Sequence, residues 1–175
     1  VYETCGDFVD IVTSLGFTES AVETAATIVI RGNAASEVEG IRPYEDLRVR
    51  QAIAGAIDNA VCLEIGYANR GPVAENHHVC PLHPAYAELP PLEANRSEAA
   101  RLMAETGGAD FTHELVSLDD GWERDTADAV AAQLRDAGIQ VRRRVVSGSE
   151  YWTNWKTYPF SATTWNHRPL GTQAL

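Results

Sequence analysis

The apolar residues of this chain fall into short runs with two different spacings. Compact or alternating runs, which are typical of β-strands, occur at residues 26–33, 110–118, 139–146 and 160–165. Between them, apolar residues recur every three or four positions, which predicts helices at residues 6–16, 45–66, 95–108, 122–137 and 149–156. Residues 1–3 are expected to be the tail of a further strand. Strands separated by helices predict an α/β fold with a mostly parallel, mixed sheet flanked by helices.

Capping residues and glycines indicate where the predicted helices begin and end. Asp46 is expected to cap the helix of residues 45–66, and Gly66 is expected to end it. Asn95 and Glu98 have the spacing of a capping box at the start of the next helix. The residues expected to be buried on the helices are Phe8, Ile11, Val12 and Leu15, then Ile53, Ile57, Val61 and Ile65, then Ala127, Val130, Ala131 and Leu134.

Residues 67–94 form a long proline-rich loop that contains a cluster of potential metal ligands. The ligand types are those that zinc, nickel and copper prefer, and the candidates are His77, His78, Cys80 and His83. Their spacing matches no structural zinc pattern, because a second, distant pair of ligands is missing. Adjacent histidines in an extended segment also point to opposite sides. We therefore expect a surface loop with no physiological metal and no cofactor.

The size and net charge of the chain bound the number of domains and exclude some classes of function. With 175 residues, 45% of them hydrophobic, the chain is long enough for one domain with a substantial core. A formal net charge of −11 argues against a nucleic-acid surface, which needs basic patches. The basic run at residues 142–144 is expected to be a solvated edge or face of a strand. No apolar run approaches the roughly 20 residues of a membrane span.

Catalytic signatures are not found in the sequence. There is no nucleophile elbow and no glycine-rich phosphate loop, and the acidic pairs Glu45–Asp46 and Asp119–Asp120 stand where helix N-termini favour negative charge. The three cysteines are Cys5, Cys62 and Cys80. Cys62 with Cys80 is the plausible disulfide pair, and free thiols are the alternative. We therefore expect a protein that is not an enzyme.

Residues 43–59, PYEDLRVRQAIAGAIDN, resemble the signature of the extracytoplasmic solute-binding proteins of peptide ABC transporters, the dipeptide/oligopeptide-binding family 5. Residues 95–107 and 127–152 are similar to two further segments of that family, in the same order. The resemblance implies a type II periplasmic-binding-protein-like lobe. Residues 1–175 would then be a single domain, the second lobe of a two-lobed protein, and a piece of a longer polypeptide.

The same resemblance implies a function outside the cytoplasmic membrane. A periplasmic or membrane-tethered protein would capture peptides or peptide-like solutes and deliver them to ABC permease subunits. Its partners would be the solute, the permease and the missing first lobe, with no nucleic acid. The alternatives are binding of nickel complexes, opines or sugars, or a ligand-sensing domain of a regulator. A metal-dependent enzyme built on the His/Cys loop is disfavoured.

Candidate ligand-binding residues follow the predicted strands, because ligands of such sheets gather at the carboxyl ends of strands. Peptide-binding members of the family carry an aspartate shortly after a tryptophan there, whereas this chain has Asn166, His167 and Arg168 after Trp165. Trp165 would form a stacking wall, and Arg168 would favour a ligand carboxylate or another anion. Asn33 is a further candidate. The alternatives are core packing for Trp165, an internal salt bridge for Arg168 and a turn for Asn33. Trp152 and Trp155 are expected to face the core or the cleft. The alternative to a surface position for the proline-rich loop is that it reaches the cleft, where His77, His78 or His83 would tune the choice of ligand near neutral pH.

Overall fold

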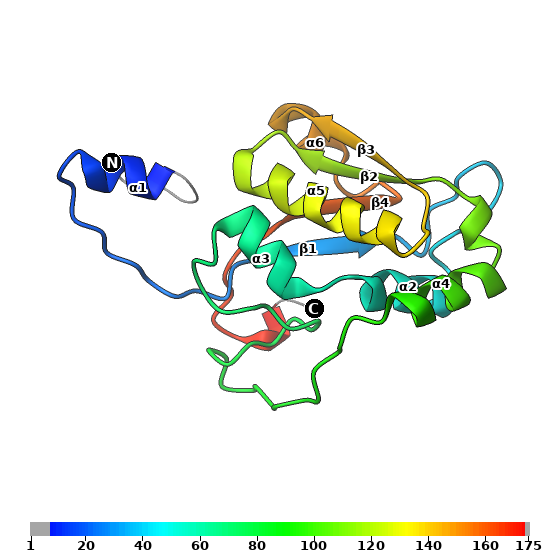
Figure 1. Cartoon of the computed structure of the whole chain (residues 1–175), viewed down its shortest axis with the longest axis horizontal. Helices are drawn as coiled ribbons and strands as arrows, with labels where there is room; N and C mark the ends of the chain where they lie inside the picture. The colour runs from blue at the N-terminus through cyan, green and yellow to red at the C-terminus, as the bar shows by residue number, and fades with distance from the viewer. Residues whose placement is uncertain (1–7, 174–175) are drawn as a thin grey trace.

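The computed structural model describes residues 8–173, so residues 1–3 and Cys5 lie outside the described part. Within it, one sheet contains β1 (Thr27–Gly32), β2 (His113–Leu118), β3 (Val141–Val146) and β4 (Phe160–Trp165), in the order β1-β4-β2-β3 (Figure 1). β4, β2 and β3 run parallel, and β1 pairs antiparallel with β4. The predicted mixed, mostly parallel sheet is therefore confirmed.

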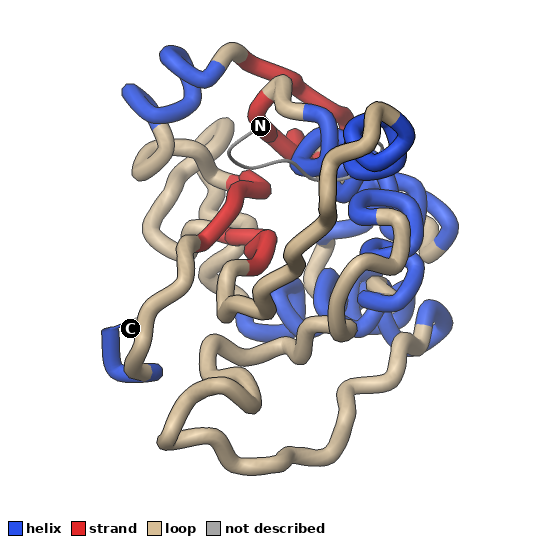
Figure 2. Tube along the Cα trace, turned by 90° about the vertical axis from the view of Figure 1, so that its left-hand side faces the viewer, coloured by secondary structure: helices blue, strands red, loops and turns tan. Residues whose placement is uncertain are grey.

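Helices cover both faces of this sheet. On one face, α5 (Gly121–Asp136) packs across the strands, with α2 (Leu47–Ala56), α3 (Asn59–Tyr67) and α4 (Arg96–Glu105) around it. The main core lies under these helices and includes Leu115 and Phe160. The other face is covered by α6 (Gly148–Asn154), which buries Tyr151 against Val116 in a smaller core. Figure 2 shows the strands between these two layers.

The predicted helix of residues 45–66 is wrong as a single element, because two helices meet there. Asp46 caps α2 as expected, accepting a hydrogen bond from the Arg48 backbone N–H at 2.8 Å. Ile57 then adopts an extended conformation, and Asp58 caps α3 by accepting from the Ala60 N–H at 2.9 Å. Gly66 does not end the helix: it lies inside α3, buried against α5, and the chain leaves the helix at Ala68.

The start of α4 confirms half of the predicted capping box. The Asn95 side chain accepts a hydrogen bond from the Glu98 backbone N–H at 3.0 Å. The reciprocal bond is not made, because the Asn95 N–H donates to the Gly55 carbonyl at 2.6 Å and Glu98 pairs with Arg101. The short helix η1 (Gly108–Asp110) follows α4, and η2 (Gly171–Gln173) lies near the end of the chain.

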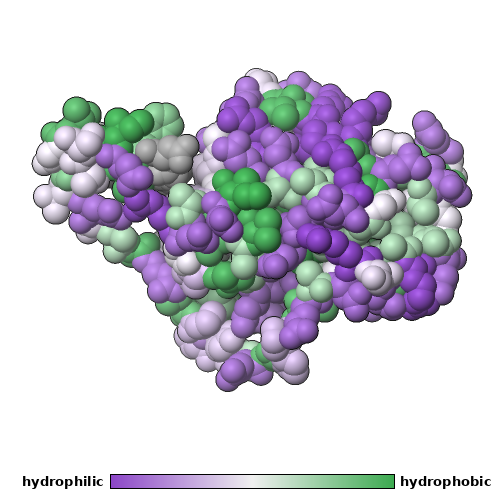
Figure 3. All heavy atoms as spheres, in the orientation of Figure 1, coloured by the Kyte–Doolittle hydropathy of each residue, from purple (hydrophilic) through white to green (hydrophobic). Residues whose placement is uncertain are grey.

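The helix α1 (Phe8–Ser14) lies apart from the sheet (Figure 1). The expectation that its apolar stripe is buried is wrong, because Phe8, Ile11 and Leu15 are 66%, 53% and 71% exposed. The space-filling view shows apolar surface over α1 (Figure 3). Ion pairs from Arg70 to Asp10 and Glu19 connect the segment to the end of α3. Among residues 8–173, no helix has the length and hydrophobicity to cross a membrane.

Candidate functional site

Strand direction decides which candidate residues can act together. β2 and β4 are parallel, so Leu118 and Trp165 end at the same edge of the sheet. β1 runs the other way, which places Asn33 next to the start of β4, where its N–H donates to the Pro159 carbonyl at 2.8 Å. The Gly32–Phe160 and Thr27–Trp165 pairs are five residues apart, about 17 Å. The structure therefore does not bring Asn33 to Trp165.

Asn33 makes the contacts of a turn. Its side-chain oxygen accepts a hydrogen bond from the Ala35 N–H at 3.1 Å, and its side-chain nitrogen donates to the Lys156 carbonyl at 3.3 Å. Asparagine favours such local contacts in turns. A ligand-binding role for Asn33 stays a prediction that these contacts do not support.

Arginine and tryptophan side chains gather beside β4 in what we call the Trp165 cluster, made of Arg31, Trp152, Trp155 and Trp165. The ring centroids of Trp155 and Trp165 are 6.2 Å apart, and those of Trp152 and Trp155 are 6.5 Å apart. The Arg31 guanidinium lies 4.9 Å from the centre of the Trp155 ring. Trp152 is 51% exposed, so the alternative of a core position is wrong for it. The cluster offers flat aromatic faces and a cation, which suit recognition of a polar, partly flat solute.

A buried carboxylate fixes the backbone next to Trp165. Glu123, in the first turn of α5, is only 5% exposed, and its Oε1 accepts hydrogen bonds from the N–H of Thr164, at 2.9 Å, and from the Thr164 hydroxyl. Nothing in the sequence marks this residue, because its partner lies 41 positions away. The contact holds the carboxyl end of β4 against the start of α5, at the residue next to Trp165.

The segment after β4 carries the remaining candidates, which are all exposed. The His167 ring Nδ1 accepts a hydrogen bond from the Ala25 N–H at 3.0 Å. Within residues 8–173, the Arg168 guanidinium has no carboxylate at ion-pair distance, so the alternative of an internal salt bridge is not supported. Arg168 and Asn166 both remain accessible to a ligand.

The proline-rich loop reaches this same segment through His83. The His83 ring is buried, with Nδ1 accepting from the Cys80 N–H at 2.9 Å and Nε2 lying 2.9 Å from the Arg168 carbonyl, to which it donates. Gly171 also packs against Val79. The expectation of a surface loop is therefore wrong for this part of the loop, because buried contacts connect it to the segment after β4.

The candidate metal ligands do not gather. His77 pairs with Glu75 at 2.8 Å and stacks on Tyr86, whereas His83 is engaged with backbone groups. Among the residues that the structure describes, no three histidine, cysteine or acidic side chains form a group that could hold a metal ion. Cys62 and Cys80 are free thiols, not a disulfide. Burial raises the pKa of the Cys62 thiol to about 11.

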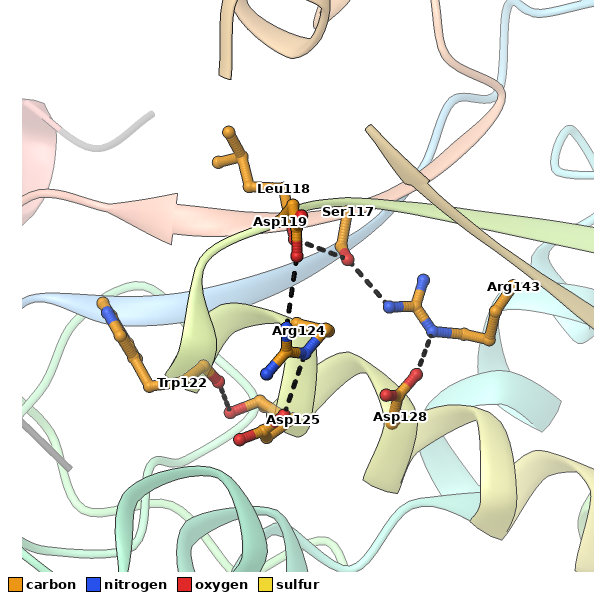
Figure 4. A network of polar contacts seen from close by, with 9 residues as sticks. Ser117, Leu118, Asp119, Trp122, Arg124, Asp125, Asp128 and Arg143 are labelled. Carbon is orange, nitrogen blue, oxygen red and sulfur yellow. Dashed lines mark hydrogen bonds and ion pairs between the residues drawn. The ribbon is translucent and has the colours of Figure 1, made fainter. Parts of the chain in front are cut away.

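Asp119, directly after β2, and two aspartates of α5 are paired with arginines (Figure 4). Arg124 contacts both Asp119 and Asp125 at 3.2 Å. Arg143 binds Asp128 at 2.7 Å and donates to the Ser117 hydroxyl at 2.8 Å. The Arg143 side chain is only 11% exposed, so the expectation that the basic run is solvated is wrong for Arg143. The expectation is confirmed for Arg142 and Arg144, whose side chains are exposed on the edge strand β3. These aspartates are thus engaged in ion pairs within the chain.

Comparison with solved structures shows a type II periplasmic-binding-protein-like fold. The chain superposes on the substrate-binding domain of an oligopeptide ABC transporter from Bacillus anthracis with a TM-score of 0.73 and 19% identity, covering 93% of this chain and 34% of that one. NikA from Brucella suis in complex with Fe(III)-EDTA gives a TM-score of 0.72, 20% identity, and coverages of 94% and 36%. The binding protein AgaA from A. tumefaciens R10 in complex with agropinic acid gives 0.70, 20%, and coverages of 81% and 29%.

This chain thus spans about a third of the length of these proteins. No match was found among curated protein sequences. A family model described as "Bacterial extracellular solute-binding proteins, family 5 Middle" matches residues 12–174, nearly the whole chain. The chain therefore belongs to the family 5 extracellular solute-binding proteins.

Proposed function

We propose that this chain is the substrate-capturing lobe of an ABC-importer binding protein that takes up peptides or peptide-like solutes. The observation that carries the proposal is the Trp165 cluster, followed directly by the exposed Arg168, at the carboxyl edge of the sheet of a family 5 protein. Aromatic faces would stack on the solute, and the guanidinium of Arg168 would bind a carboxylate through two parallel hydrogen bonds.

In this proposal the chain is one domain, the second lobe of a two-lobed protein, and a first lobe closes over the solute. The share of its relatives that the chain spans, about a third, supports this organisation. So does the exposed apolar stripe of α1, which a further part of the polypeptide would bury. The closed, loaded protein would deliver its solute to permease subunits from the periplasm or from the outer surface of the membrane.

The solute itself is the part of the proposal that an experiment must define. The full-length polypeptide, purified without refolding, should retain its solute, which native mass spectrometry would identify. A retained peptide supports the proposal. A retained nickel complex, opine or sugar would replace peptides by one of the alternatives within the family, and a protein that retains and binds no small solute would overturn solute capture.

Arg168 provides the matching test of the site. Arg168→Ala in the full-length polypeptide should weaken binding of the identified anionic solute at least tenfold by calorimetry, because charge-assisted pairs contribute about 1.5–3 kcal/mol. Arg101→Ala is the matched control, since Arg101 is an exposed arginine of α4 that pairs with Glu98 and Glu105. Unchanged affinity in Arg168→Ala would remove Arg168 from the site.

A further inference from the structure

Four hydrogen-bond donors share one face of the sheet beside the Trp165 cluster. Arg31 of β1 pairs with Ser161 of β4, and the Val29–Thr163 and Thr27–Trp165 pairs follow in the same register. Directly opposite residues project to the same face, as do alternate residues along one strand. The side chains of Arg31, Ser161, Thr163 and Trp165 therefore lie on the face that α6 and Trp155 cover.

All four donors have a buried polar atom without a hydrogen-bond partner among residues 8–173. These atoms are Nη1 of Arg31, the hydroxyls of Ser161 and Thr163, and Nε1 of Trp165. Ser161 and Thr163 are almost fully buried, at 1% and 0% exposed. Buried polar groups in folded proteins are nearly always hydrogen-bonded, and an unpaired charged donor is particularly costly. The hydroxyls of Tyr151 and Tyr158, in the smaller core on the same face, are also without a partner in the described part of the chain. An acceptor bound among these groups would satisfy several of the donors at once.

The charge at this position points to a negatively charged acceptor. No acidic residue of the described chain pairs with Arg31, although the chain as a whole carries a net charge of −11. The Arg31 guanidinium is instead held against Trp155 at 4.9 Å, and the Lys156 ammonium lies 5.4 Å from the same ring. Two cations around one indole raise the local positive potential, and the stacking orients the guanidinium for a planar partner.

We propose that Arg31, Ser161, Thr163 and Trp165 form a subsite for a carboxylate of the captured solute. A carboxylate accepts hydrogen bonds only, at up to four positions, and its plane matches the fork of an arginine. The hydroxyls and the indole N–H would fill the positions that the guanidinium leaves open. This assignment rests on the proposed function, and it adds a second anion-binding position that is independent of Arg168.

The test uses glutarate as the probe, so that it does not depend on knowing the natural solute. Equilibrium dialysis of the full-length polypeptide at constant ionic strength should show saturable binding of glutarate, and no saturable binding of its uncharged diamide. Arg31→Gln should weaken glutarate binding at least tenfold, whereas Arg101→Gln should leave it unchanged. Arg31→Lys should give an intermediate loss, because lysine keeps the charge and loses the fork.

A second variant keeps the test valid if Arg31→Gln does not fold. Thr163→Val removes one donor with little change of shape, and it should weaken glutarate binding severalfold while the thermal melt stays cooperative. Equal binding by the wild type and both variants, or no saturable binding by the wild type, would overturn the subsite. Tighter binding of inorganic phosphate than of glutarate would overturn the assignment to a carboxylate.

Together, the experiments distinguish failure of the anion subsite from failure of the proposed function. If glutarate binding depends on Arg31 but mass spectrometry and calorimetry find no small solute, the anion subsite stands and solute capture fails. If a solute is retained with equal affinity by the wild type and Arg31→Gln, solute capture stands and the subsite fails.

Discussion

Gly66 lies where α3 packs closely against α5, so adding a single methyl group there should clearly change the stability of the protein. An added Cβ would stand 1.9 Å from Oγ1, 2.8 Å from Cβ and 2.9 Å from Cα of Thr126 on α5. The Thr126 hydroxyl already donates to the Trp122 carbonyl at 2.7 Å, and the Cα is backbone that a side-chain rotation cannot move. Gly66→Ala therefore forces α3 and α5 apart by about half an ångström or more, from 2.9 Å to an ordinary contact of at least 3.4 Å.

Two opposing effects determine how much Gly66→Ala changes the free energy of unfolding. Alanine is favoured over glycine inside a helix by about 1 kcal/mol. Overpacking a closely packed contact costs about 1–3 kcal/mol, and a contact against backbone belongs at the upper end of that range. We expect Gly66→Ala to lower the free energy of unfolding by about 1–2 kcal/mol. Gly55→Ala in α2 is the matched control, because nothing lies within 4 Å of its Cβ, and it should raise stability by about 0.5–1 kcal/mol.

Urea unfolding at 25 °C, followed by circular dichroism, measures both variants. With a slope of about 2 kcal/mol per molar urea, Gly66→Ala should lower the midpoint by about 0.5–1 M at unchanged slope. Adding Thr126→Ala to Gly66→Ala should restore only part of the loss, because the contact with the Thr126 Cα remains. If Gly66→Ala is as stable as Gly55→Ala, the close approach of α3 and α5 is refuted.

Two further predictions concern buried titratable groups. Burial lowers the pKa of His113 below its ordinary value of 6.5, so the folded protein keeps the ring neutral while the unfolded chain becomes protonated. The stabilisation from the neutral His113 ring should therefore be fully present above pH 6.5. The free energy of unfolding should fall as the pH drops from 6.5 towards the lowered pKa of the folded state, by up to about 1.4 kcal/mol per pH unit. In His113→Gln, the urea midpoint should fall less steeply with decreasing pH than in the wild type. A variant with the same pH dependence as the wild type would contradict this. The raised pKa of Cys62, about 11 against 9.0, predicts alkylation by N-ethylmaleimide at pH 8 about 100-fold slower than for an ordinary thiol. Peptide mass mapping of the native protein tests it with the free, partly exposed Cys80 as internal comparison, and equal labelling of the two would disprove it.

Several features of this protein follow from the sequence because their causes are local. The four strands and the caps at Asp46 and Asn95 depend on residues a few positions apart, and the structure confirms them. The signature at residues 43–59 likewise indicated the family that the family model identifies. Spacing, capping and short motifs can all be read along the chain.

The site was only partly predictable, because its geometry depends on strand direction. Trp165 and Arg168 were predicted because Trp165 ends a predicted strand and Arg168 follows three residues later, and their role in the site stays a prediction. Asn33 follows a strand as well, but β1 is antiparallel, and no local signal reports that. Arg31 and Glu123 gained their significance from partners in β4, far away in sequence.

The sequence by itself thus determined the alternation of helices and strands, apart from the break between α2 and α3, and the caps at Asp46 and Asn95, since these rest on near neighbours in the chain. Its short motifs also indicated the family. The tertiary structure alone decided that Gly66 makes room for Thr126, that the stripe of α1 stays exposed, and that His83 connects its loop to Arg168. Each of these depends on which distant segment arrives at a given place. A glycine, an apolar stripe or a histidine has the same local signature whether or not such a partner exists.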